Sequence, residues 1–312
     1  MKSLDELATD PVSSDSDETS TTRKNNLTNR VVSAVIAFPF LFICIWQGGI
    51  WLIVLLVALA ILGTLELLAL FGIRSVWLRA LWSGFAAVIV LDLGSWILTW
   101  VLSTSETVPI WTLFFCYFGL GIVLLSFWFL IDALKSRPRS LQAYITNKNA
   151  LFIMVGSLYI GLTLSHAILL RNLDNGELWL SLAVIAVFAV DSSAYFVGSC
   201  IGKRQMAPKI SPNKTWEGAI AGMAGGVITV LAFTSLSSLS LSINVGNVTS
   251  LGLVIGLAAQ VGDLIESKIK RMQNVKESGG LIPGHGGVLD RLDSVLLPLV
   301  FVYHGVGWLT IL

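Results

Sequence analysis

The chain has 312 residues, of which 55% are hydrophobic and only 12% are charged, against roughly 25% charged residues in an ordinary soluble domain. A soluble core would break its apolar runs at amphipathic intervals, but here the apolar residues form blocks close to the ~20 residues that a helix needs to cross a bilayer. The net charge of +1 gives no reason to expect nucleic-acid binding. Composition therefore excludes an ordinary soluble domain and indicates a polytopic membrane protein.

Residues 1–29 form a polar tail that is rich in Ser and Thr and carries six acidic residues. Such a composition cannot bury a core, so we predict that the tail is disordered. Transit peptides are poor in acids, which argues against an organellar address but does not exclude an organellar membrane. Residues 30–312 are predicted to form one transmembrane domain.

We predict that this domain is an all-α bundle of about nine spans. Of the 20 Lys and Arg residues, all but Arg171 fall in segments that share one side of the membrane if the nine spans are real. The positive-inside rule makes that side cytoplasmic, together with the N-terminus. The predicted spans are 31–46, 50–71, 76–100, 109–134, 150–170, 178–200, 217–236, 248–266 and 294–312.

Two long cytoplasmic connections, 191–218 and 260–293, carry the polar residues that a site would need. Asp191 and Asp263 follow long apolar runs, where an acid costs ~2.5–3.5 kcal/mol and therefore faces a cavity or a partner. Asp263 and Glu266, like Asp290 and Asp293, are spaced i, i+3 and share one helix face.

Carboxylate pairs of this kind suit Mg²⁺, which usually takes one or two carboxylates together with phosphate oxygens of a substrate. The alternative is that the acids only pair with nearby cations at the membrane interface, namely Lys268, Arg271 or Arg291. Glu66 and Asp92 also lie inside predicted spans, and we expect them to reach a shared cavity.

Glycines surround His285 in the second connection, at positions 279, 280, 284, 286 and 287. Glycine lets backbone N–H groups approach an anion closely, although such turns also simply connect helices. The segment has neither a Walker loop nor a Rossmann fingerprint. Neighbouring cations nevertheless predict a polyphosphate site: Lys209, Lys214, Lys270, Arg271, Lys276 and Arg291. His285 would donate to a phosphate, shuttle a proton or stabilise the turn.

The stretch from Ser267 to Asp293 resembles the hallmark of phosphatidate cytidylyltransferases, in particular at 267–271, 276–277 and 282–293. Segments 191–195, 208–218 and 260–267 also resemble parts of that family. The family usually has Asp where Glu277 stands, so the carboxylate is kept but displaced by one methylene group.

The resemblance implies that the chain transfers CMP from CTP to phosphatidic acid, giving CDP-diacylglycerol and pyrophosphate. It implies that Asp263, Asp290 and Asp293 ligate Mg²⁺, and that His285 and Arg291 join the two aspartates Asp263 and Asp290 as catalytic residues. It further implies a second cation, a homodimer and a bacterial-type plasma membrane. The substrate-binding residues would be Lys209, Ser211, Lys214, Lys270, Arg271, Lys276, Gly286 and Gly287.

Two other functions remain open from the residues alone. One is a related membrane transferase or kinase that uses CTP on another lipid, such as a polyprenol. The other is a cation-coupled transporter with Asp191 and Asp263 as ion ligands, which would not explain the cations and glycines of the second connection. Within the enzyme, we expect residues 203–214 to hold phosphatidic acid and residues 270–293 the nucleotide, unless both connections form one shared site.

Overall fold

The structure is a computed structural model. It describes residues 35–73, 75–102, 141–237, 239, 244–279 and 286–311, with the backbone alone for residues 92–102, 141–148, 150 and 308–311. The predicted tail 1–29, the predicted span 109–134, the side chain of Asp92 and the whole of His285 lie outside these limits.

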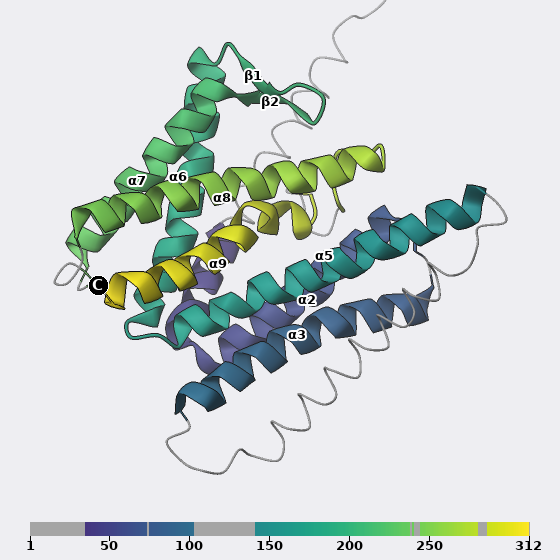
Figure 1. The fold of residues 1–312 in the computed structure, drawn as a ribbon, viewed down its shortest axis with the longest axis horizontal. Coiled ribbons are helices and arrows are strands. Elements are labelled where there is room, and N and C mark those ends of the chain that lie inside the picture. Colours follow the sequence, from purple (N-terminus) through teal and green to yellow (C-terminus); the bar gives the residue numbers. More distant parts are fainter. Residues whose placement is uncertain are drawn as a thin grey trace, which may run out of the picture.

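Helices fill the described chain wherever a span was predicted. A short helix, Val35–Gln47, precedes the labelled elements of Figure 1. These are α2 (Gly49–Leu70), α3 (Val76–Leu102), α5 (Leu141–Arg171), α6 (Gly176–Ile201), β1 (Gln205–Ala207), β2 (Ser211–Thr215), α7 (Trp216–Leu236), α8 (Val245–Met272) and α9 (Leu289–Ile311). Among the described residues, α2, the part of α5 from Leu151, α6, α7 and α8 are long and apolar enough to cross a membrane. The chain is therefore an α-helical integral membrane protein, while the nine-span count stays a prediction.

Small residues allow α6, α7 and α8 to pack closely against one another, with α8 crossing the other two (Figure 1). A Cβ added at Gly222 of α7 would lie 3.1 Å from the carbonyl oxygen of Val190 in α6. A Cβ at Gly256 of α8 would lie 3.0 Å from the Cα of Met223 in α7. Such contacts leave room for backbones but not for side chains, as is common between membrane helices.

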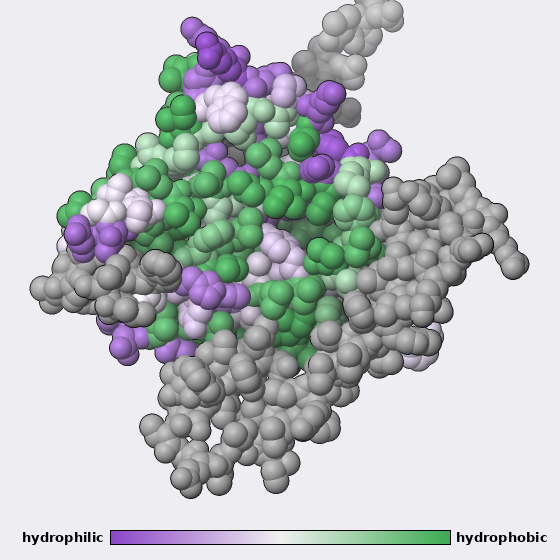
Figure 2. Space-filling view, viewed as in Figure 1, coloured by the Kyte–Doolittle hydropathy of each residue, from purple (hydrophilic) through white to green (hydrophobic). Residues whose placement is uncertain are grey.

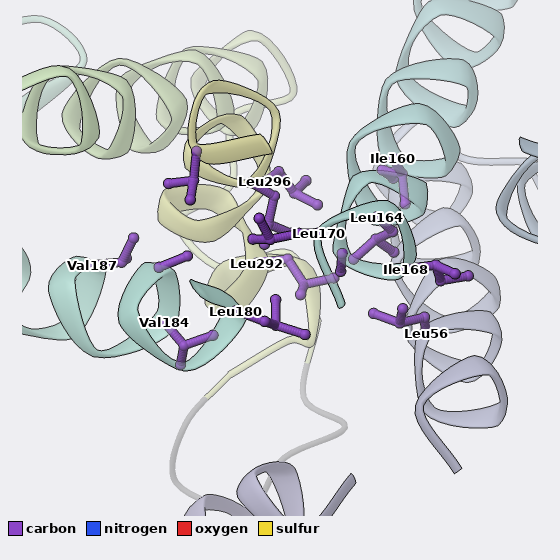
Figure 3. Packing of buried hydrophobic residues seen from close by; sticks show 14 of the residues in the cluster. Leu56, Ile160, Leu164, Ile168, Leu170, Leu180, Val184, Val187, Leu292 and Leu296 are labelled. Carbon is purple, nitrogen blue, oxygen red and sulfur yellow. The ribbon is translucent and has the colours of Figure 1, made fainter. Parts of the chain in front are cut away.

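The other helices form a second group, in which α5 packs against α2, α3 and α9. Figure 3 shows the buried side chains between them, including Leu56 of α2, Leu164 of α5 and Leu292 of α9. Helix α9 also packs against α8, so it joins the two groups. Figure 2 shows apolar side chains over the middle of the molecule and hydrophilic ones gathered above them, around the β1–β2 hairpin.

The hairpin was not predicted. Strands β1 and β2 are antiparallel, with Gln205 opposite Thr215 and Ala207 opposite Ser211. The segment has two prolines and no apolar alternation, so its sequence carries no strand signal. A residue of α7 stabilises the hairpin instead. The Glu217 carboxylate accepts hydrogen bonds from the backbone N–H groups of Lys203 and Arg204, each at 3.2 Å.

Arg171, the single cation predicted on the far side, joins helix ends there. Its guanidinium donates to the carbonyl oxygens of Ile45 at 2.8 Å and Trp46 at 3.1 Å, and pairs with Glu177 at 3.1 Å. A cation at the C-terminus of a helix is favoured by the helix dipole. Arg171 therefore stabilises the junction of Val35–Gln47 with α5 and α6.

Candidate functional site

The candidate site is a cavity of about 480 Å³ whose lining changes from apolar to charged. Its apolar walls come from Val35–Gln47, α2, α5, α6 and α9, and include Leu56, Leu164, Leu180 and Leu292, which Figure 3 labels. Its polar part is formed by Asp191, Asp263, Asp290, Arg291, Asp293 and Ser294. The cavity therefore joins both long polar connections to the interior of the helix bundle.

Close packing of α8 against α9 brings the carboxylates together. A Cβ at Gly262 would overlap the carbonyl oxygen of Asp293, so glycine lets the two backbones touch immediately beside Asp263. Asp263 and Asp293 interact electrostatically across this contact. From α6, Asp191 accepts a hydrogen bond from the Ser294 hydroxyl at 2.9 Å and lies within electrostatic range of Asp263.

The β hairpin is tied to α8 by two polar contacts. Lys214 Nζ lies 2.6 Å from Asp263 Oδ2, and Ser267 donates to Asp263 Oδ1 at 3.2 Å. Arg271 Nε donates to the carbonyl oxygen of Ile210 at 3.1 Å. The two long polar connections of the sequence therefore meet, which favours one shared site over separate lipid and nucleotide segments.

Lys270 is buried between two carboxylates. Its Nζ lies 3.1 Å from Glu266 Oε1 and 2.6 Å from Asp290 Oδ1. Asp290 Oδ2 also accepts from the backbone N–H groups of Ser278 at 3.0 Å and Gly287 at 2.9 Å. Burial alone would raise the pKa of Asp290, but the Lys270 ammonium and these two amides lower it below its ordinary value. Asp290 is therefore held as an anion in the first turn of α9.

The remaining predicted residues lie around this centre. Arg291 is exposed on α9 and lines the cavity. Lys209 and Lys276 are exposed, and Ser211 is half-buried at the start of β2. Gly286 has φ +79°, and a Cβ there would lie 3.0 Å from Asp290 Oδ2, so both backbone and space require glycine at this position. The roles assigned to these residues stay predictions.

Within the part of the chain that the structure describes, no three or more His, Cys, Asp or Glu side chains are grouped as a metal site. A magnesium ion needs no such group, because one or two carboxylates and substrate phosphates supply its oxygen ligands. Asp263 and Asp293 both line the cavity and lie within electrostatic range of each other. Their oxygens are ligands of the type that Mg²⁺ takes. Both oxygens of Asp263 already have partners, Lys214 and Ser267. Both oxygens of Asp290 have partners as well, Lys270 and two backbone amides.

Three functional candidates were absent from the predicted set of site residues. The sequence marked Asp191 as an acid after a long apolar run and Glu266 as an acid on the same helix face as Asp263. It did not predict their partners, which are Ser294 and Lys270. Glu66 was expected to reach the shared cavity. The side chain instead contacts the segment before α9, with Ser278 Oγ at 3.0 Å from its Oε2. The only signal in the sequence was the cost of an acid within an apolar span.

The whole bundle, from residue 28 to residue 309, matches the model of the Cytidylyltransferase family. The chain belongs to this family. A similar protein from Bacillus subtilis (strain 168), named phosphatidate cytidylyltransferase, is 41% identical over 155 residues, which are 49% of this chain and 56% of that protein. Proteins of the same name from Staphylococcus epidermidis and Staphylococcus aureus (strain COL) are 29% and 30% identical over 276 residues, which are 87% of this chain and 96% of each relative. The cytidylyltransferase resemblance seen in residues 267–293 therefore extends over nearly the whole chain.

Proposed function

We propose that this chain catalyses the phosphatidate cytidylyltransferase reaction, in which CTP and phosphatidic acid give CDP-diacylglycerol and pyrophosphate. The observation that carries the proposal is the cavity whose apolar walls run into a cluster of carboxylates and Arg291. A lipid with an anionic head group has the same division into apolar and charged parts. Family membership and the names of the relatives support the same reaction.

The arrangement suggests how the lipid is bound. Phe38 and Phe40 line the cavity and are exposed, so the acyl chains would enter from the bilayer along the helix Val35–Gln47. The phosphate would then lie at Arg291, which lines the cavity, and near Lys214, which pairs with the cavity-lining Asp263. The nucleotide would approach from the hairpin side, next to the half-buried Gly286, and His285 would donate to its phosphates.

The chemistry calls for charge neutralisation more than for proton transfer. A phosphate monoester has its second pKa near about 6, so phosphatidic acid is already an anion near neutral pH and needs no strong general base. Its phosphate oxygen attacks the α-phosphorus of CTP, and the bond to the β-phosphate oxygen breaks as pyrophosphate leaves. Phosphatidic acid and CTP are both anions and repel each other. Cations that offset this repulsion in the transition state therefore accelerate the reaction.

Mg²⁺ bound by Asp263 and Asp293, with Asp290 as a further ligand, would neutralise charge on the triphosphate and the leaving pyrophosphate. Lys214 already lies against Asp263, so it would place a positive charge beside the same phosphates. The second cation and the homodimer are further expectations from the family resemblance.

We place the chain in a bacterial plasma membrane, as its relatives come from bacteria, with the N-terminus and the site on the cytoplasmic side. The charge distribution supports this orientation. Reporter fusions at Ser140 and Ser242, which are predicted to lie on opposite sides, test it. Equal reporter signals would mean that a span has been miscounted.

Purified protein with CTP labelled at either the α- or the γ-phosphate tests the reaction. With phosphatidic acid present, the α-label should move into the lipid fraction and the γ-label should appear in pyrophosphate. A γ-label in the lipid would identify a CTP-dependent lipid kinase instead. No transfer of either label, with labelled cation taken up by proteoliposomes, would favour the transporter.

The lipid position has its own test. Ala37 lines the cavity and Val35, two residues earlier on the same helix, does not. Ala37→Phe should raise the KM for long-chain phosphatidic acid and leave the KM for CTP unchanged, because the added ring narrows the apolar part of the cavity. Val35→Phe is the matched control with an equal ring on an exposed position. Equal kinetics for the two variants would contradict lipid binding in this cavity.

A further inference from the structure

Glu66 is a carboxylate in the last two turns of α2, and its residue is 4% exposed. An acid within a membrane helix is costly unless a partner compensates for it. Among the described residues, the ion pairs do not include Glu66. Its compensation therefore comes from hydrogen bonds.

Within the described part of the chain, these hydrogen bonds come from Ser278 and from the start of α9. Glu66 Oε1 accepts from the backbone N–H of Val288 at 2.9 Å. Its Oε2 accepts from the backbone N–H of Leu289 at 2.8 Å and from the hydroxyl of Ser278 at 3.0 Å. The first N–H groups of a helix have no partner within the helix and carry partial positive charge, so a buried carboxylate is stabilised there.

Two glycines of the segment before α9 lie against the Glu66 carboxylate, which leaves no room for a larger residue. A Cβ at Gly279 would lie 2.7 Å from Glu66 Oε1, and a Cβ at Gly287 would overlap both Glu66 Oε2 and the Ser278 hydroxyl. On the other side, Asp290 accepts the backbone N–H groups of Ser278 and Gly287. Two carboxylates thus hold residues 278–279 and 286–289 between them, and only Asp290 belongs to the predicted site.

We propose that Glu66 is a positioning residue for nucleotidyl transfer. Its carboxylate fixes the N-terminus of α9, and the first two turns of that helix carry Asp290, Arg291 and Asp293, three residues that line the cavity. Glu66 does not line that cavity, so it acts through α9. This inference rests on the proposed function and assigns a role within it to a residue 212 or more positions away from its partners.

Glu66→Gln tests the proposal, because an amide keeps the size of the side chain but has only one oxygen. Its NH₂ group cannot accept a hydrogen bond, so at least one of the three donors loses its acceptor. We expect kcat at saturating substrates to fall about ten- to a hundredfold, since displacement of catalytic groups by about 1 Å has effects of this size. Glu66→Asp, which keeps two acceptor oxygens with a shorter reach, should lose less activity than Glu66→Gln.

Thr64→Val is the matched control, since Thr64 lies two residues earlier in α2 and is completely buried. It should leave kcat unchanged. Hydrogen exchange of the peptide that contains residues 286–289 gives a readout independent of activity: exchange should be about tenfold faster in Glu66→Gln than in wild type or Thr64→Val.

A merely structural role would reduce the yield of folded protein or its melting temperature but leave kcat per folded molecule unchanged, and that outcome would overturn the proposal. Unchanged exchange in an active enzyme would overturn it as well, while the proposed function would stand. If wild-type protein forms no CDP-diacylglycerol, the proposed function fails, and the positioning role of Glu66 with it.

Discussion

Replacing Lys270 by Met tests the buried charges that join α8 to α9. Methionine keeps an unbranched side chain of similar length but leaves Glu266 and Asp290 without their shared cation. The three side chains are only 7–11% exposed, so solvent screens them weakly. Breaking a buried ion pair by removing one partner costs about 3–5 kcal/mol, because the other charge stays buried and uncompensated.

Thermal unfolding of the protein in detergent measures this loss. A destabilisation of 1 kcal/mol lowers the Tm of a domain of 150–250 residues by roughly 2–4 °C, so we expect a decrease of at least about 6 °C. Lys268→Met is the matched control, since Lys268 is exposed on the same helix and a surface substitution changes stability by about 0.5 kcal/mol or less.

Adding Glu266→Gln to Lys270→Met should recover part of the loss, because one of the two uncompensated carboxylates becomes neutral. The reasoning would be refuted if Lys270→Met melted at the same temperature as Lys268→Met. It would also be refuted if the double variant were less stable than Lys270→Met alone.

Three further predictions concern the site and the far end of the bundle. Asp263→Asn should lower kcat by orders of magnitude without preventing membrane insertion, because a metal ligand acts mainly in the transition state; near-normal turnover at ordinary Mg²⁺ would contradict this. Lys214→Ala and Arg291→Ala should each raise the KM for both CTP and phosphatidic acid. A selective effect on one substrate in mixed micelles would instead mean that each connection binds a different substrate. Arg171→Gln should lower the free energy of unfolding by about 2 kcal/mol. Charged hydrogen bonds contribute about 1.5–3 kcal/mol each, but this side chain is 23% exposed and solvent weakens its interactions. A decrease in kcat in addition to the loss in Tm would contradict a purely structural role for Arg171.

The sequence was most informative about the helices. Apolar blocks placed most of the described helices to within a few residues, because lipid requires long uninterrupted hydrogen-bonded segments. Helix α5 was predicted to begin at residue 150 but begins at Leu141. Helix α8 was predicted to end at residue 266 but continues to Met272. Its last turns are charged, and they remain helical because Lys270 and Arg271 find partners in Asp290 and the hairpin.

The site was only partly predictable. The i, i+3 spacing of Asp290 and Asp293 assigns them to one helix face, but spacing within a helix does not reveal which helix lies opposite. The contact of Asp263 with Lys214 therefore had to come from the fold. The same holds for Glu66, whose partners lie more than 200 residues later in the chain.

The ion network on α8 has a consequence for membrane insertion. During synthesis α8 leaves the ribosome before α9, so Lys270 reaches the membrane interface before Asp290 does. Glu266 lies four residues earlier on the same helix and 3.1 Å from the Lys270 ammonium. An opposite charge at this spacing reduces the cost of bringing either residue into the bilayer alone. Helix α8 thus carries a provisional counter-ion of its own, and Asp290 becomes the second partner when α9 inserts.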